Sequence, residues 1–202
     1  MKMPKKAGIL FVSMGAVLIL SALLLFCYNG LEARRAGQEA ELLLEDIQAA
    51  ISEGPTMETL AEDETIPDEL PVVWIDGYEY IGYLSFPDWE LHLPVMAKWD
   101  YERLKLAPCR HFGSSLTDDL VIAAHNYDTH FGGLSKLEKG SEILFTDMEG
   151  NVNRYALQYV KTLDPDQVDA VQNSGYDLVL YTCTIGGSYR VVAFCDRVPE
   201  EA

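Results

Sequence analysis

An uncharged, proline-free run of 22 residues, residues 7–28, most constrains how this chain folds. A helix of about 20 apolar residues spans the hydrocarbon core of a bilayer. A cleaved signal peptide has a shorter apolar core and ends in small residues, and neither feature is clear here. The run therefore predicts an uncleaved membrane anchor. The alternatives are a cleaved signal and a buried helix of a soluble protein.

The charges around this run predict its orientation. Lys2, Lys5 and Lys6 precede or begin it, whereas the whole chain of 202 residues has a formal net charge of −17. Positive residues beside a membrane segment favour the cytoplasmic side, so we expect the N-terminus inside the cell and the C-terminal body outside. The acidic body also argues against nucleic acid as a partner, because phosphate binding needs a basic surface.

Residues 29–54 predict a second helix. They are rich in Ala, Glu, Leu and Gln, and Leu43, Ile47 and Ile51 form an apolar stripe. Gly54-Pro55 is a stop signal for this helix. The acidic residues that follow, up to residue 74, are bounded by prolines and are predicted to form a linker.

From Tyr78 onwards the pattern changes to short β-like runs, separated by turn signals such as Gly150-Asn151. The runs cover residues 78–86, 91–96, 119–125, 141–147, 153–163, 176–183 and 189–198. Many strands with few helices between them predict a mainly β domain, either a compact barrel or a sandwich. Short helices are expected within residues 101–109 and 132–140.

The last two runs place a thiol opposite a cation. If Gly186-Gly187 forms a two-residue hairpin turn, Cys183 and Arg190 are directly opposed, with Cβ atoms about 5 Å apart. A nearby cation stabilises a thiolate, and a guanidinium donates hydrogen bonds to an oxyanion. A thiol nucleophile also needs an acid and base. His125, at the end of an apolar run, is the best candidate, and His130 is the second.

Each of these residues has a structural interpretation as well. A lone cysteine is more often a small buried apolar residue, and a lone arginine or histidine more often has a structural role. The other cysteines are Cys27, Cys109 and Cys195, and no two of the four form a C-x-x-C pair, which leaves zinc and thioredoxin-like sites without support. A Cys109–Cys195 disulfide stays open. No metal-ligand loop spacing stands out, and no cofactor is expected.

Three stretches resemble the sortase family. Residues 179–183, VLYTC, with Arg190 beyond them, resemble the sortase pattern T-L-x-T-C and its strand-borne arginine. Residues 121–160 resemble the segment that carries the sortase histidine, and residues 80–95 resemble the family's first hairpin. The chain has no clear Asp-Pro-aromatic lid and no room for a long helix before Tyr176, so we expect a class D-like or unassigned sortase.

The resemblance implies a membrane-anchored cysteine transpeptidase of Gram-positive bacteria with a closed β-barrel of about eight strands. Cys183 would attack a backbone carbonyl in an LPXTG-like C-terminal sorting signal, His125 would transfer protons, and Arg190 would hold the oxyanion. Thr182 would help shape the substrate pocket. The implied partners are surface proteins that bear the signal, an amine acceptor such as a cell-wall precursor, and the membrane.

The expected organisation has five parts. These are a cytoplasmic N-terminus (1–6), a transmembrane anchor (7–28), a juxtamembrane helix (29–54), an acidic linker (55–74) and a catalytic domain (75–202). The alternative function is a membrane-anchored extracellular binding module in which the sortase-like barrel is inactive. A different cysteine enzyme such as an L,D-transpeptidase is less compatible, because VLYTC lacks a His and a Gly close before the cysteine.

Overall fold

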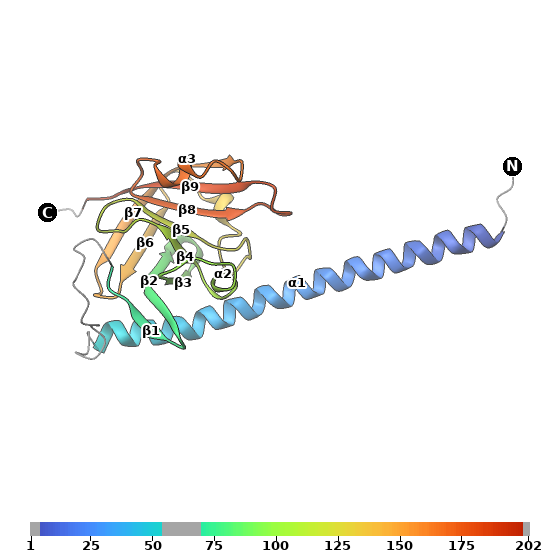
Figure 1. Ribbon diagram of the computed structural model, residues 1–202, viewed down its shortest axis with the longest axis horizontal. Coiled ribbons are helices and arrows are strands. Elements are labelled where there is room, and N and C mark those ends of the chain that lie inside the picture. The colour runs from blue at the N-terminus through green and yellow to red at the C-terminus, as the bar shows by residue number, and fades with distance from the viewer. Residues whose placement is uncertain (1–4, 54–69, 200–202) are drawn as a thin grey trace. The chain divides into compact units, whose positions relative to one another are not determined.

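The computed structural model describes residues 5–53 and 70–199 (Figure 1). The chain divides into two compact units, one ending at Arg35 and the other beginning at Ala36, and each is described by itself. The two helices expected over residues 7–28 and 29–54 are one continuous helix, α1 (Lys5–Glu53). No proline interrupts it, and its Ala, Leu, Glu and Gln residues favour helix.

In the first unit, α1 exposes an unbroken apolar surface. Leu18, Leu24 and Phe26 are 64%, 71% and 78% exposed. Within the described residues, α1 is the one helix that is long and apolar enough to cross a membrane. Such a surface is unfavourable in water and suits the hydrocarbon core of a bilayer, which fits a membrane anchor.

In the second unit, the remainder of α1 packs against the β domain. We call residues 36–53 the docked segment. Ala36, Ala40 and Ile47 are buried, and Ala40 belongs to the main hydrophobic core. Leu43 and Ile51 pack beside Ile47 in a second cluster. The apolar stripe predicted from the sequence therefore faces the β domain.

The linker predicted over residues 55–74 falls mostly outside the described residues. Of its last part, Leu70 is buried in the main core, and Val73 and Trp74 already belong to the first strand. The β domain thus begins a few residues before the predicted boundary at residue 75.

The β domain is a closed barrel with one additional strand. Its strands are β1 (Val73–Ile75), β2 (Tyr78–Phe86), β3 (Leu91–Met96), β4 (Cys109–Phe112), β5 (Leu120–Ala123), β6 (Glu142–Asp147), β7 (Val152–Leu163), β8 (Leu178–Cys183) and β9 (Arg190–Arg197). They pair in the order β1-β2-β3-β4-β5-β8-β9-β7-β6. An antiparallel pairing of β2 with β6 closes the ring, and β1 extends it beside β2. The predicted barrel is confirmed.

Short helices fill the connections between the strands. They are η1 (Pro87–Trp89), α2 (Arg103–Leu106), η2 (Leu134–Lys136) and α3 (Asp169–Gln172). Two of them, α2 and η2, lie within the segments where the sequence predicts helix. The prediction for residues 101–109 misses that its last residue, Cys109, begins β4.

The site is positioned by two neighbouring parallel strands of the barrel, β5 and β8 (Figure 1). All four residues of β5 are buried, which is typical of a parallel strand covered on both faces. The register pairs Leu120 with Leu178 and Ala123 with Tyr181. Parallel strands end at the same edge, so the segments after Ala123 and Tyr181 emerge together.

Candidate active site

The edge where β5 and β8 end brings two of the predicted residues together. Beyond the last ladder pair, the Ala124 N–H donates to the Tyr181 carbonyl over 3.1 Å. The Thr182 hydroxyl donates to the Ala124 carbonyl over 2.8 Å, so the strands stay paired for one residue more. If the same register continued by one further step, His125 would lie beside Cys183. Residues in register on adjacent strands project from the same face.

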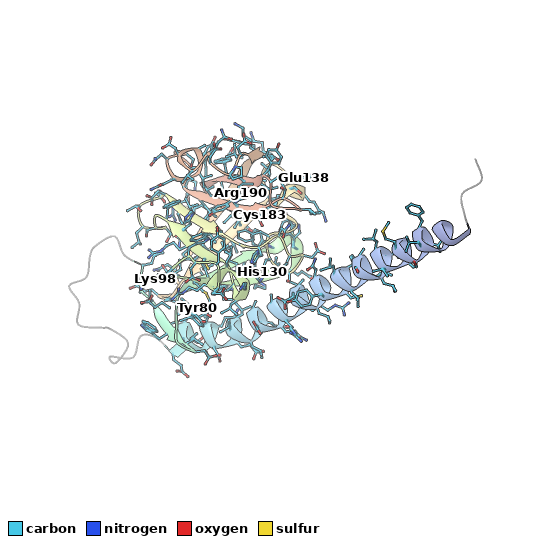
Figure 2. The ribbon with its side chains drawn as sticks, turned by 45° about the vertical axis from the view of Figure 1, so that its right-hand side comes forward. Tyr80, Lys98, His130, Glu138, Cys183 and Arg190 are labelled. Atoms are coloured by element: carbon cyan, nitrogen blue, oxygen red, sulfur yellow. The ribbon has the colours of Figure 1, made fainter. Side chains whose placement is uncertain are left out.

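Cys183 and Arg190 form the last pair of the β8–β9 ladder. Figure 2 shows both side chains at the ends of these neighbouring strands. The predicted register is therefore confirmed, but the predicted turn is wrong in detail. The Gly187 N–H donates to the Thr184 carbonyl over 2.8 Å, so Ile185 and Gly186 are the central residues of the turn. Gly186 has a φ of 85°, which suits glycine at the third position of a type II turn.

The guanidinium of Arg190 is held by its own hairpin. Its Nη1 donates to the Gly187 carbonyl over 3.0 Å and to the Tyr189 carbonyl over 3.2 Å. The side chain is half-buried. In the described part of the chain, Nε and Nη2 have no hydrogen-bond partner, so they are available to a group bound beside Cys183. The loop carbonyls fix the cation without neutralising it.

His125 begins the loop that follows β5. Its ring packs on the ring of Tyr127 with centroids 4.9 Å apart, and its carbonyl accepts from the Phe131 N–H over 3.1 Å. Burial, and to a lesser extent the charge of Lys105, lower the pKa of the imidazole. A neutral imidazole at neutral pH is suited to accept a proton from a thiol or an amine.

His130, the second candidate, lies in the interior. Its side chain is fully buried, and neither ring nitrogen has a hydrogen-bond partner among the residues that the structure describes. Burial lowers its pKa to about 4, and the nearby His125 adds to the effect. Its ring centroid is 5.6 Å from that of Tyr127, which separates it from His125. His130 therefore packs the base of the loop and is absent from the pocket that contains Cys183.

A pocket of about 210 Å³ opens beside Cys183. Its wall is largely apolar and is formed by α2, β4, the β7–α3 connection and β8. Thr182, Cys183 and Arg190 contribute to it, as do Leu104, Phe112 and Val171. The Thr182 side chain is buried and its hydroxyl is engaged with β5, so it holds the two strands in register beneath the pocket. His125 lies next to this edge and outside the lining.

The remaining cysteines lie elsewhere. Cys27 is exposed on α1, whereas Cys109 and Cys195 are buried and free, so the disulfide left open by the sequence is not formed. Burial raises the pKa of the Cys109 thiol to about 12 and raises that of Cys195 as well. Both thiols stay protonated at neutral pH. Within residues 5–53 and 70–199, no group of His, Cys, Asp or Glu side chains is arranged to hold a metal ion.

Comparison with known families decides what this barrel is. The family described as Sortase domain matches residues 84–198, which is more than half of the chain. The chain belongs to the sortase family. The match includes β5, β8 and β9 and therefore the three residues His125, Cys183 and Arg190. None of the curated proteins compared with the chain matches it.

Solved structures of sortases share the fold. Sortase C1 of Streptococcus suis is 26% identical over 62% of this chain and 76% of its own, with a TM-score of 0.54. Sortase C of Streptococcus pneumoniae is 21% identical over 79% of this chain and 98% of its own, with a TM-score of 0.61. Sortase D5 of Clostridium perfringens is 17% identical over 80% of this chain and 99% of its own, also with a TM-score of 0.61. A class C and a class D structure share the same TM-score of 0.61 with this sortase, and its class stays unassigned.

One pair in the pocket of this sortase was missed at the sequence level. The Tyr181 hydroxyl and His111 Nδ1 are 2.8 Å apart. The His111 ring packs on Phe112, with centroids 3.8 Å apart, and on Trp99, with centroids 4.9 Å apart. Both members of the pair line the pocket beside Cys183. The local sequence does not predict this pair, because β4 is short and Tyr181 has the pattern of an ordinary strand residue.

Proposed function

We propose that this protein is a sortase cysteine transpeptidase that cleaves an LPXTG-like C-terminal sorting signal and transfers the protein to an amine. The observation that carries the proposal is the convergence of three elements at one barrel edge. Cys183 pairs with Arg190 across β8 and β9, and the parallel register of β5 and β8 brings His125 to the same edge. Membership of the sortase family supports assigning catalysis to these three residues.

The proposed first half-reaction forms a thioester. Cys183 Sγ transfers its proton to His125 and attacks the carbonyl carbon of the scissile amide. The C–N bond breaks, and His125 returns the proton to the departing amine. In the second half-reaction the acceptor amine gives a proton to His125 and attacks the thioester, and the proton returns to Cys183 as the thiol leaves. Covalent catalysis thus divides one amide exchange into two easier steps.

Arg190 would stabilise the oxyanion of each tetrahedral intermediate. Its Nη1 is held by the Gly187 and Tyr189 carbonyls, so the guanidinium is already positioned before substrate arrives. Such preorganised donors act chiefly in the transition state, because the negative charge on the carbonyl oxygen develops only there. The adjacent apolar pocket fits the apolar part of an LPXTG-like segment, with Leu104, Phe112 and Val171 as walls.

The exposed apolar surface of α1 supports the proposal that the enzyme is anchored in the cell membrane by a single pass. The lysines at the N-terminus favour an N-in orientation, with the catalytic domain outside the cell. Both partners of the proposed reaction, a surface protein that bears the signal and a cell-wall precursor or another protein amine, would be available there.

The test is mass spectrometry of the purified protein after incubation with a panel of sorting peptides. We expect a mass increase on Cys183 that equals the N-terminal peptide fragment, its disappearance on addition of an amine, and no adduct with Cys183→Ala. A folded wild-type protein that binds a peptide without forming an adduct would instead indicate the inactive binding module.

A further inference from the structure

The docked segment of α1 lies against the loop that begins at His125. Gly37 is the point of closest approach: a Cβ added there would stand 2.8 Å from Thr129 Cγ2 and 3.0 Å from Thr129 Cβ. Carbon atoms in van der Waals contact are about 3.5–4.0 Å apart, so a side chain at residue 37 displaces Thr129 or the helix. The flanking Ala36 and Ala40 are buried in the same surface.

A second glycine of the same helix shows that this approach is specific. Glycine in a helix interior is unfavourable relative to alanine, because it loses more backbone freedom on folding. None of the described residues lies within 4 Å of a Cβ added at Gly30, so alanine fits there without strain. An added Cβ therefore meets Thr129 at Gly37, whereas at Gly30 it meets none of the described residues.

Hydrogen bonds and ring contacts connect the residues on either side of Thr129 to His125. The His130 and Gly132 N–H groups both donate to the Tyr127 carbonyl, over 2.9 and 2.8 Å. The Tyr127 ring packs on both the His125 ring and the His130 ring. A Cβ added at Gly132 would stand 2.7 Å from the Tyr127 carbonyl oxygen, so the loop is also tightly packed at Gly132.

We propose that the docked segment positions His125, and that the Gly37–Thr129 contact is where it does so. The proposal rests on the proposed function only in treating His125 as the proton-transfer group. Gly37 and Thr129 are positioning residues, since neither lines the pocket beside Cys183. The helix that carries the membrane anchor therefore also completes the site, and its residues from Ala36 onwards belong to the catalytic unit.

The test uses the full chain in detergent and a pair of matched variants, Gly37→Ala and Gly30→Ala. Misplacing a reacting group by about 1 Å costs roughly a hundredfold in rate. We expect Gly37→Ala to displace His125 by less than this, and therefore to lower kcat for peptide cleavage roughly tenfold with KM nearly unchanged. Gly30→Ala should leave kcat within about twofold, because the added methyl meets nothing. Equal activity of the two variants would overturn the proposal.

A compensating substitution identifies the contact. Thr129→Ser removes Cγ2, the closest atom, and keeps the hydroxyl. Because Thr129 Cβ still stands 3.0 Å from the added carbon, the double variant Gly37→Ala/Thr129→Ser is expected to regain part of the lost kcat, and a double variant as slow as Gly37→Ala would exclude the Cγ2 contact as the cause. Should Gly37→Ala fail to fold, Thr129→Ala serves instead: opening a gap below Gly37 should lower kcat several-fold, and an unchanged kcat would contradict the proposal.

A readout that needs no turnover separates this inference from the proposed function. The nuclear magnetic resonance signals of the His125 imidazole and its titration should shift in Gly37→Ala and stay unchanged in Gly30→Ala. If the wild-type protein cleaves no peptide, the proposed function fails, yet the imidazole signals still report the coupling. If the enzyme is active and the His125 signals are identical in both variants, the coupling alone is refuted.

Discussion

Cys183 and Arg190 face each other as the final pair of the β8–β9 ladder, immediately before the chain turns at Ile185-Gly186. The hairpin fixes the guanidinium through the Gly187 and Tyr189 carbonyls and leaves Cys183 at the rim of an apolar pocket. The distance between thiol and cation is therefore set by a ladder of backbone hydrogen bonds and by a short turn.

Replacing Arg190 should act on the transition state. Loss of one oxyanion donor typically costs roughly a hundred- to thousand-fold in rate, so Arg190→Ala is expected to lower kcat by that order with a smaller change in KM. Arg190→Lys should recover little, because an ammonium lacks the planar fork. Steady-state kinetics with a sorting peptide measures both. Arg154→Ala, which removes an exposed salt bridge to Glu142, is the control and should leave kcat unchanged.

Alkylation should distinguish Cys183 from the other thiols. In a Cys27→Ser background, iodoacetamide at neutral pH is expected to label Cys183 alone, because Cys109 and Cys195 are buried and burial raises the pKa of both thiols. Peptide mapping by mass spectrometry locates the label. The Arg190→Ala protein should still be labelled, since alkylation needs no oxyanion site. Labelling of Cys109 or Cys195 in the folded protein would contradict the buried positions described here.

The orientation of the anchor is testable on intact protoplasts. Externally added protease should digest the catalytic domain and spare the N-terminal residues, because the lysines before the apolar run favour the cytoplasmic side. A known outer-face protein and a known cytoplasmic protein serve as controls. Full protection of the domain under conditions that digest the outer-face control would reverse the topology.

Stability should fall at mildly acidic pH because of His130. Burial lowers its pKa in the folded state to about 4, whereas the ordinary value is 6.5, so between these values the unfolded chain binds a proton that the folded chain does not. The free energy of unfolding should therefore decrease as pH falls from about 6.5 towards 4, by about 3 kcal/mol in total. The lowered pKa values of His111 and His125 act in the same direction.

Denaturant unfolding at a series of pH values measures this effect. Because carboxylates also titrate towards pH 4, the comparison with variants isolates the histidine. His130→Leu should flatten the dependence, since it removes the buried imidazole, whereas His92→Gln, at an exposed position, should retain it. A slope that is equal in wild type and His130→Leu would show that His130 is not the group responsible.

Local patterns were enough to predict part of the fold. The runs at residues 78–86 and 91–96 coincide with β2 and β3, and the register of Cys183 with Arg190 follows from counting outward from the turn. The turn itself was misplaced by one residue, because both glycines adopt positive φ. The register of Cys183 with Arg190 is nevertheless kept, since Thr184 still bonds to Tyr189 and Ser188 is left between the turn and that pair.

Other elements depend on contacts that are distant in the sequence. Strand β4 joins β3 through the single pair Met96–Cys109 and has an irregular register with β5, so its four residues carry no strand pattern of their own. The packing of the docked segment was equally hidden. An apolar stripe at Leu43, Ile47 and Ile51 does not say which surface it meets. His125 was predicted from its position at the end of an apolar run, and the β5–β8 register puts that position at the edge of the barrel.

The parallel pairing of β5 with β8 also has a kinetic consequence. The Thr182–Ala124 hydrogen bond joins residues that are 58 positions apart, so this edge of the barrel does not exist until a long loop has closed. The β8–β9 hairpin joins strands that are adjacent in the sequence, so it should form early. The pairing of β5, the strand before His125, with β8 joins residues that are distant in the sequence, and such pairing is slow in β-rich proteins. During refolding, the β8–β9 hairpin should therefore form before activity appears. The rate at which peptide cleavage recovers then reports the closure of the barrel.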